Sequence, residues 1–145
     1  MGASGPLRVA RVIEAITGSV QRTFGRAITF DACDQAGQFL LPEAEAIPVA
    51  LTVNELLTNA VKHSQSGDVR CAVAVRGEEI DVDILNRGAL PPGFDLANVR
   101  GGVSGLGLVR ALLPRRSSTL AITPYGDDVR ARVVLRAPSV QREGQ

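Results

Sequence analysis

A change of hydrophobic period after residue 65 constrains the fold of this 145-residue chain more than any other feature. From Pro42 to His63 the sequence reads as one long helical segment, and Pro48 inside it predicts that the helix starts or kinks near residue 49. From Val69 to Ile84 apolar and polar residues alternate instead, which predicts an antiparallel hairpin with one buried face. The central unit is therefore predicted to be a long helix followed by a half-buried hairpin.

Shorter elements surround this unit. Residues 7–23 carry apolar side chains at helical spacing and predict an amphipathic helix. The remaining predicted elements are strands at 27–31 and 38–42, a loop at 87–104, a short helix at 106–113, a second hairpin at 119–123 and 129–136, and a frayed tail at 137–145. Hairpins combined with helices predict an α+β fold, with a mainly antiparallel sheet and helices on one face.

The composition fits one globular domain and excludes several function classes. Hydrophobic residues make up 45% and charged residues 21% of the chain, and the formal net charge is +1. A nucleic-acid binder usually has a basic excess and stacking aromatic residues, whereas aromatic residues are only 3% here. No apolar run is long enough to span a membrane, and residues 1–6 lack the features of a secretory signal and read as a tag or linker. We therefore expect no contact with nucleic acid or with a membrane.

The few cysteine and histidine residues exclude further kinds of site. Cys33 and Cys71 are widely spaced among apolar or small residues, so we expect two reduced thiols of a cytoplasmic protein. Two cysteines and one histidine, His63, do not support a structural zinc site. No G-x-S-x-G elbow accompanies His63, and no G-x-x-x-x-G-K-[ST] loop occurs. A serine-nucleophile triad and a P-loop are therefore excluded.

Three polar residues of the long helix share one face. Glu55, Asn59 and His63 are spaced by four, while apolar residues cover the neighbouring faces. One interpretation is a solvated polar stripe. The other is a site for a hydrated divalent cation and phosphates, in which Asn59 supplies a neutral oxygen to Mg²⁺ and Glu55 accepts a proton or orients water. Lys62, the only lysine of the chain, then adds positive charge for phosphate.

Two further stretches combine glycine with groups that suit a nucleotide. Asn86 continues the buried parity of the strand before it, so its amide needs a partner, and a purine amino group can donate to its carbonyl. Gly88 then lets the backbone approach a flat ring. Glycines from 101 to 107 lead into the predicted helix 106–113, whose N-terminus can bind phosphate. The alternatives are an ordinary Asn-Arg-Gly turn and an unliganded flexible loop.

Together, NELLTNAVKH in the long helix, NRG at a strand end and GLGL at a helix start resemble the Bergerat-type (GHKL) ATP-binding superfamily. Within it, residues 7–136 most resemble the catalytic and ATP-binding domain of bacterial sensor histidine kinases. The resemblance implies a two-layer α/β sandwich that binds ATP and Mg²⁺, with Asn59 as the metal ligand. It implies catalytic roles for Glu55, Lys62 and His63. The nucleotide contacts that it implies are Asn59, Asn86, Gly88, Gly105, Leu106 and Gly107, with residues 89–104 as the ATP lid.

Two departures from the family pattern bear on nucleotide binding. The first glycine box of the family reads D-x-G-x-G, with the aspartate on adenine, whereas this chain has Asn86 at the first position and Leu90 at the last. An amide still accepts a hydrogen bond from the adenine amino group, but without charge assistance. A hydrogen bond to a charged group is worth roughly 1.5–3 kcal/mol, against about 1 kcal/mol for a neutral one. The departures predict weaker ATP binding or a relaxed nucleotide preference.

The resemblance implies the catalytic domain of a two-component sensor histidine kinase, a phosphotransferase that donates the γ-phosphate of Mg-ATP to a histidine. His63 is the only histidine and lies in the nucleotide motif, so the phosphoacceptor is expected on a dimerisation domain outside this chain, with a response regulator as an indirect partner. A cytoplasmic location is expected, including the cytoplasmic part of a membrane-bound sensor. Two alternatives stay open: an anti-sigma-factor-type serine kinase or switch, and a degenerate interaction module that has lost ATP.

Overall fold

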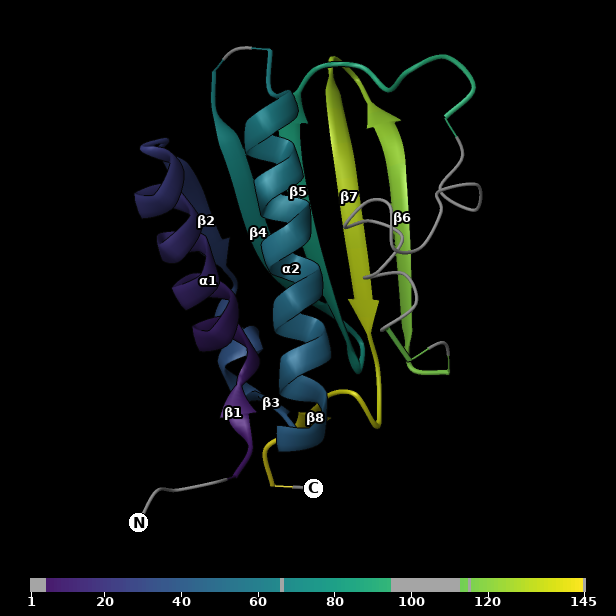
Figure 1. The fold of residues 1–145 in the computed structure, drawn as a ribbon. Coiled ribbons are helices and arrows are strands. Elements are labelled where there is room, and N and C mark those ends of the chain that lie inside the picture. Colours follow the sequence, from purple (N-terminus) through teal and green to yellow (C-terminus); the bar gives the residue numbers. More distant parts are fainter. Residues whose placement is uncertain (1–4, 66, 95–112, 115, 145) are drawn as a thin grey trace.

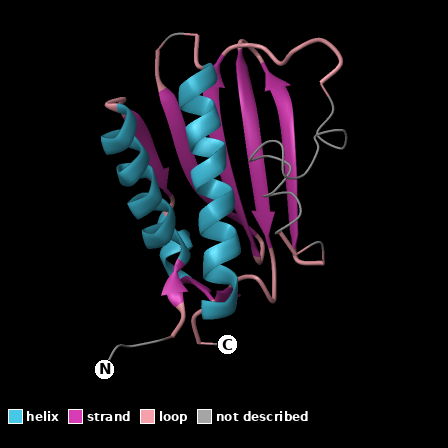
Figure 2. Cartoon of the chain, in the orientation of Figure 1, coloured by secondary structure: helices cyan, strands magenta, loops and turns pink. Residues whose placement is uncertain are grey.

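A computed structural model describes residues 5–65, 67–94, 113–114 and 116–144 of the chain. Its main body is a five-stranded sheet with two long helices packed on one face (Figure 1). Figure 2 shows the same two layers coloured by secondary structure. The predicted two-layer α+β architecture is confirmed. Neither of the two helices in the described part of the chain is long and apolar enough to cross a bilayer.

The five-stranded sheet is mixed but mainly antiparallel. Its strand order is β2-β4-β5-β7-β6, and only the β2–β4 pair is parallel. The strands are β2 (Ile28–Ala32), β4 (Val69–Arg76), β5 (Glu79–Arg87), β6 (Ser118–Tyr125) and β7 (Asp128–Leu135). Both predicted hairpins are present, because β4 pairs with β5 and β6 pairs with β7.

Helix α1 (Val9–Phe24) is the amphipathic helix that the sequence predicts. Its apolar positions Val9, Ile13 and Val20 are buried. Thr17 is buried on the same face, and its hydroxyl donates to the Ile13 carbonyl at 2.8 Å. Gly25 ends the helix with a left-handed φ of 62°, a conformation that glycine adopts without a steric penalty.

Helix α2 (Glu43–His63) confirms the helical segment predicted from Pro42 to His63. It runs through Pro48, so the later start predicted near residue 49 is wrong. Proline lacks the N–H that would bond to the carbonyl one turn earlier. Pro48 is the sixth residue of α2, so one backbone hydrogen bond, to the Ala44 carbonyl, is lost. The fully buried Val49 and Val53 anchor this part of α2 to the core, and the Thr52 hydroxyl donates to the Pro48 carbonyl at 2.8 Å.

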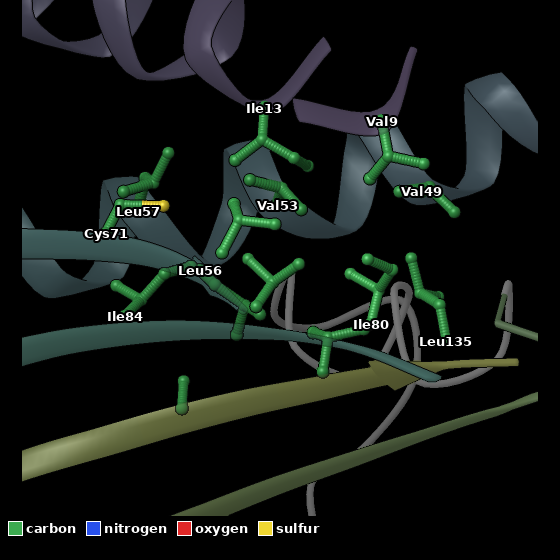
Figure 3. Close-up of a cluster of buried hydrophobic side chains, with 14 of the residues drawn as sticks. Val9, Ile13, Val49, Val53, Leu56, Leu57, Cys71, Ile80, Ile84 and Leu135 are labelled. Atoms are coloured by element: carbon green, nitrogen blue, oxygen red, sulfur yellow. The ribbon is translucent and has the colours of Figure 1, made fainter. Parts of the chain in front are cut away.

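The hydrophobic core lies between the two helices and the side of the sheet that faces them (Figure 3). Alternation along β5 points Ile80, Val82 and Ile84 toward the helices, as the period of two predicts. Leu57 of α2 is also fully buried in this cluster. Cys71 is a free thiol in the same core, and its burial raises its pKa from the ordinary value of 9.0 to about 11.

The segment after Arg136 packs against the rest of the fold, whereas the sequence predicted a frayed tail. Val140 is 1% exposed, and the Glu143 carboxylate forms an ion pair with Arg8 at 3.0 Å. A short three-stranded sheet joins both ends of the chain at the base of the helices (Figure 1). Its strands are β1 (Leu7–Arg8), β3 (Phe39–Leu41), which follows the 3-10 helix η1 (Asp34–Gln38), and β8 (Gln141–Arg142). The pairing of β8 with β3 could not be predicted, because it joins two short segments far apart in the chain and the sequence of residues 137–145 is mostly polar.

The other face of the main sheet carries paired charges. Arg132 on β7 donates to both carboxylate oxygens of Asp83 on β5, at 2.7 and 2.8 Å, and this hydrogen bonding raises the pKa of Arg132. Arg76 and Asp81 form a similar two-bond pair at 3.1 Å. This face is therefore a set of cross-strand ion pairs.

Candidate functional site

A cavity of about 370 Å³ lies between the C-terminal half of α2, the ends of β5, β6 and β7, and the loop after β5. Three polar side chains of the described residues reach it: Asn59, His63 and Asn86. The other lining residues are apolar: Leu56, Ala60, Ile84, Ala89, Leu90, Pro91, Phe94, Ile122, Val129 and Ala131. A mainly apolar cavity with few polar groups is the usual form of a small-molecule site.

Strand register forms the sheet side of this cavity. Ile84 of β5 lies opposite Ala131 of β7, and Ala131 lies opposite Ile122 of β6. Asn86 lies opposite Val129 two pairs further along, on the same face of the sheet. The β6 and β7 residues were not predicted as part of the site, because their place beside β5 is a long-range pairing. Their alternation within the second hairpin is the only local signal that they face the helices.

The residues predicted on α2 divide into two groups. Asn59 is half-buried and His63 is exposed, and both line the cavity, as their spacing of four on one face allows. Glu55 is half-buried one turn before Asn59 and does not line the cavity. Lys62 is exposed and does not line it either, because adjacent helical residues point about 100° apart. The structure therefore brings Asn59 and His63 together on the cavity, and Glu55 and Lys62 are not among its lining residues.

Asn86 is the most deeply buried polar group of the cavity. It is 8% exposed and lies on the helix-facing side of β5, in phase with Ile84 as the alternation predicts. Among the described residues its side chain makes one hydrogen bond, from Nδ2 to the carbonyl of the next residue at 3.3 Å. A buried amide with so little local bonding is suited to bind a polar ligand.

Two backbone hydrogen bonds hold the end of β5, one to the segment after α2 and one to the turn between β6 and β7. The Gln65 N–H donates to the Arg87 carbonyl at 2.9 Å, and the Gly88 N–H donates to the Asp127 carbonyl at 3.1 Å. Gly88 has a φ of 155°, which side chains rarely adopt. A Cβ there would lie 3.5 Å from both the Asn86 Nδ2 and the His63 carbonyl oxygen, which is ordinary contact. The backbone conformation, and not the available space, therefore requires glycine.

The third predicted stretch cannot be compared with the structure. Gly105, Leu106 and Gly107, the predicted helix 106–113 except its last residue, and the predicted lid beyond residue 94 lie outside the described residues. The described part of the lid, residues 89–94, contributes Leu90, Pro91 and Phe94 to the cavity wall. Leu90, noted in the sequence as a departure from a glycine, therefore forms part of an apolar wall.

The donor set on this cavity does not form an all-protein metal cage. Within the described ranges no group of three or more histidine, cysteine or carboxylate residues could hold a metal ion. Mg²⁺ usually keeps water ligands and takes one or two protein ligands together with substrate phosphates. The half-buried neutral amide of Asn59 fits that second arrangement.

The arrangement has a buried end and an open end. The buried end presents the Asn86 amide among apolar walls, and the open end presents His63 in the last turn of α2. A ligand with a flat ring that can hydrogen-bond and an anionic tail matches both ends.

Comparison with known proteins points in the same direction. A sequence model described as "Histidine kinase-like ATPase domain" matches residues 24–132. The fold is similar to the histidine kinase domain of a blue-light activated histidine kinase from Erythrobacter litoralis EL346, at 23% identity and a TM-score of 0.71, over 93% of this chain and 65% of that one. It is also similar to the nucleotide-free catalytic domain of histidine kinase ThkA, at 10% identity and a TM-score of 0.73, over 92% and 96% of the two chains.

A third similar structure is full-length ShkA in complex with AMPPNP, at 14% identity and a TM-score of 0.73, over all of this chain and 33% of that one. At these identities the likeness is one of fold. The chain spans less than two thirds of the first of these relatives and one third of ShkA. A search of curated proteins finds no match.

Proposed function

Because the chain belongs to the histidine kinase-like ATPase domain family, we propose that it binds Mg-ATP in the cavity between α2 and β5 and donates the γ-phosphate to a histidine of a separate domain. The observation that carries the proposal is that Asn59 and His63 from α2 and Asn86 from β5 line one apolar cavity. The chain would act in the cytoplasm, where ATP is available, as one part of a two-component system.

Burial supports one orientation of the nucleotide. Asn86 is 8% exposed, so the edge of the base pairs with it while the apolar walls hold the ring. The phosphates then extend toward the last turn of α2, where Lys62 and His63 are exposed and can donate hydrogen bonds. Backbone N–H groups of the segment containing Gly105–Gly107 are proposed to complete the phosphate contacts.

Asn59 is proposed as the protein ligand of Mg²⁺, which would neutralise charge on the phosphates when bound. Glu55 lies one helical turn before Asn59 on the same face and is half-buried. In the proposed reaction it accepts a proton or orients water and the attacking group. The contribution of the chain is otherwise positioning, because phosphoryl transfer depends mainly on alignment and charge stabilisation.

Calorimetric titration with Mg-ATP and Mg-ADP tests the binding step. We expect Asn59→Ala to abolish magnesium-dependent binding, whereas the matched Asn54→Ala, an exposed asparagine of α2 that does not line the cavity, should bind like the wild type. Unchanged affinity of Asn59→Ala would remove Asn59 from the proposed role. Failure of the wild type to bind either nucleotide at millimolar concentration would support the degenerate interaction module instead.

Transfer of a radioactive γ-phosphate from labelled ATP tests the second step. The chain is incubated with a dimerisation domain that carries a phosphoacceptor histidine, encoded in the same gene or a neighbouring one. We expect label on that partner that is lost in acid and kept in base, as for phosphohistidine. Acid-stable label on a serine of a sigma-factor antagonist would support the serine-kinase alternative and contradict the histidine assignment.

A further inference from the structure

We propose that Asn86 allows the cavity to bind purine nucleotides with either a 6-amino or a 6-oxo group, so that adenine and hypoxanthine nucleotides compete for the site with similar affinity. The inference rests on the proposed function, because it assumes that a nucleotide base reaches Asn86. It adds the substrate class that the site selects.

The surroundings of Asn86 fix its backbone but leave its amide little constrained. The backbone is held on both sides, by pairing with Val129 and by the hydrogen bond from the Gln65 N–H to the Arg87 carbonyl. In the described part of the chain the side-chain amide makes only the 3.3 Å bond from Nδ2 to that same carbonyl oxygen. This distance is at the long end for an N–H···O bond. Turning the amide over therefore sacrifices one weak interaction.

An amide carries one acceptor and one donor, and a half-turn exchanges their places. The pairing edge of adenine presents an amino donor beside the N1 acceptor, and the edge of a 6-oxo purine presents a carbonyl acceptor beside an N1–H donor. The Asn86 amide complements the first edge in one orientation and the second edge in the other. A carboxylate accepts only, so it would pair with the adenine amino group and face the lone pairs of a 6-oxo group.

No other described group on the cavity makes this distinction. Asn59 and His63 lie on α2, toward the open end, and the remaining lining residues are apolar. Asp128 lines an adjacent hollow together with Gly88, and its carboxylate lies 3.9 Å from the Arg87 guanidinium. Among the side chains that the structure describes around this cavity, discrimination at position 6 of the purine therefore depends on Asn86.

Competition binding with ATP, ITP and CTP against a fluorescent ATP analogue tests the inference in the wild-type chain. ATP and ITP differ only at position 6 and N1, and CTP controls for binding through the phosphates alone. We expect the dissociation constants of ATP and ITP to agree within about fivefold and that of CTP to be at least tenfold larger. We expect Asn86→Asp to raise the ratio of the ITP dissociation constant to the ATP dissociation constant at least tenfold, while Asn54→Asp leaves this ratio unchanged.

The outcomes separate this inference from the proposed function. A wild-type preference for ATP over ITP above thirtyfold overturns the inference and leaves ATP binding standing. Equal binding of all three triphosphates also overturns it, because the base would then not be read in the cavity. If none of the three nucleotides binds, the proposed function and the inference fail together. Because the wild-type ratio alone distinguishes these outcomes, the test holds even if the Asn86→Asp variant is too unstable to measure.

Discussion

Replacement of Gly88 by alanine isolates the contribution of one backbone conformation to the site. Holding a non-glycine residue at a positive φ such as 155° costs about 1–3 kcal/mol. The added methyl group itself costs little, because its nearest neighbours lie at 3.5 Å. Alanine also lowers the conformational entropy of the unfolded chain, which offsets about 0.4–1 kcal/mol of this cost. We therefore expect Gly88→Ala to lower the free energy of unfolding by about 1–2 kcal/mol.

Urea unfolding measures this loss as a midpoint lowered by about 0.5–1 M, for a slope of about 2 kcal/mol per molar urea. Gly77→Ala is the matched control: Gly77 has a φ of 65°, no atom within 4 Å of an added Cβ, and a place in the β4–β5 turn away from the cavity. Both variants should be destabilised, but only Gly88→Ala should weaken ATP binding. The expected loss is about fivefold, for one neutral hydrogen bond of about 1 kcal/mol between Asn86 and the base. An unchanged midpoint for Gly88→Ala would refute the reasoning, since φ 155° would then behave as ordinary extended backbone.

Three further predictions concern the core, the buried thiol and the C-terminal segment. Leu57→Ala removes a fully buried side chain and should cost about 2–5 kcal/mol in urea unfolding, whereas Leu51→Ala, an exposed position of α2, should cost much less. The pKa of Cys71 is raised from 9.0 to about 11, so its neutral thiol contributes fully to the free energy of unfolding below pH 9, and this contribution is lost as the pH rises through 11. Between pH 8 and pH 12 the free energy of unfolding should therefore fall by about 2–3 kcal/mol more in the wild type than in Cys71→Ala. Equal losses would show that the thiol ionises normally in the folded state. Removal of residues 137–145 deletes the buried Val140 and should lower the free energy of unfolding by about 1.5–3 kcal/mol. An unchanged urea midpoint would instead support the prediction of a frayed tail.

The sequence predicted those features that depend on neighbouring residues, namely the face of a strand or helix on which a residue lies. Alternation fixes which side of a strand a residue faces, so the position of Asn86 on the helix-facing side was predictable from Ile84 alone. The spacing of Asn59 and His63 fixed their common helix face in the same way. Lys62 was assigned to the site because its positive charge suits phosphate, but it does not line the cavity. Its role near phosphate stays a prediction.

Long-range pairings were beyond such reasoning. Ile122 and Val129 line the cavity only because β7 pairs with β5 and β6 with β7, and nothing within the second hairpin specifies that order. The pairing of β8 with β3 is a similar case, since it joins residues about one hundred positions apart. At Pro48 the local signal gave a wrong prediction. The burial of Val49 and Val53 in the core outweighs the helix-breaking tendency of the proline, so the helix continues through it.

The relation between the two halves of the cavity depends on a short connection more than on the core. Asn59 and His63 are carried by α2, Asn86 is carried by β5, and the closest backbone link between these elements is the hydrogen bond from the Gln65 N–H to the Arg87 carbonyl. That link comes two residues after the end of α2, so it holds the final helical turn close to the strand end. The second link, from the Gly88 N–H to the Asp127 carbonyl, ties the same strand end to the turn between β6 and β7. The polar groups of the cavity are therefore positioned by backbone bonds at its rim, while the apolar core sets only the distance between the layers.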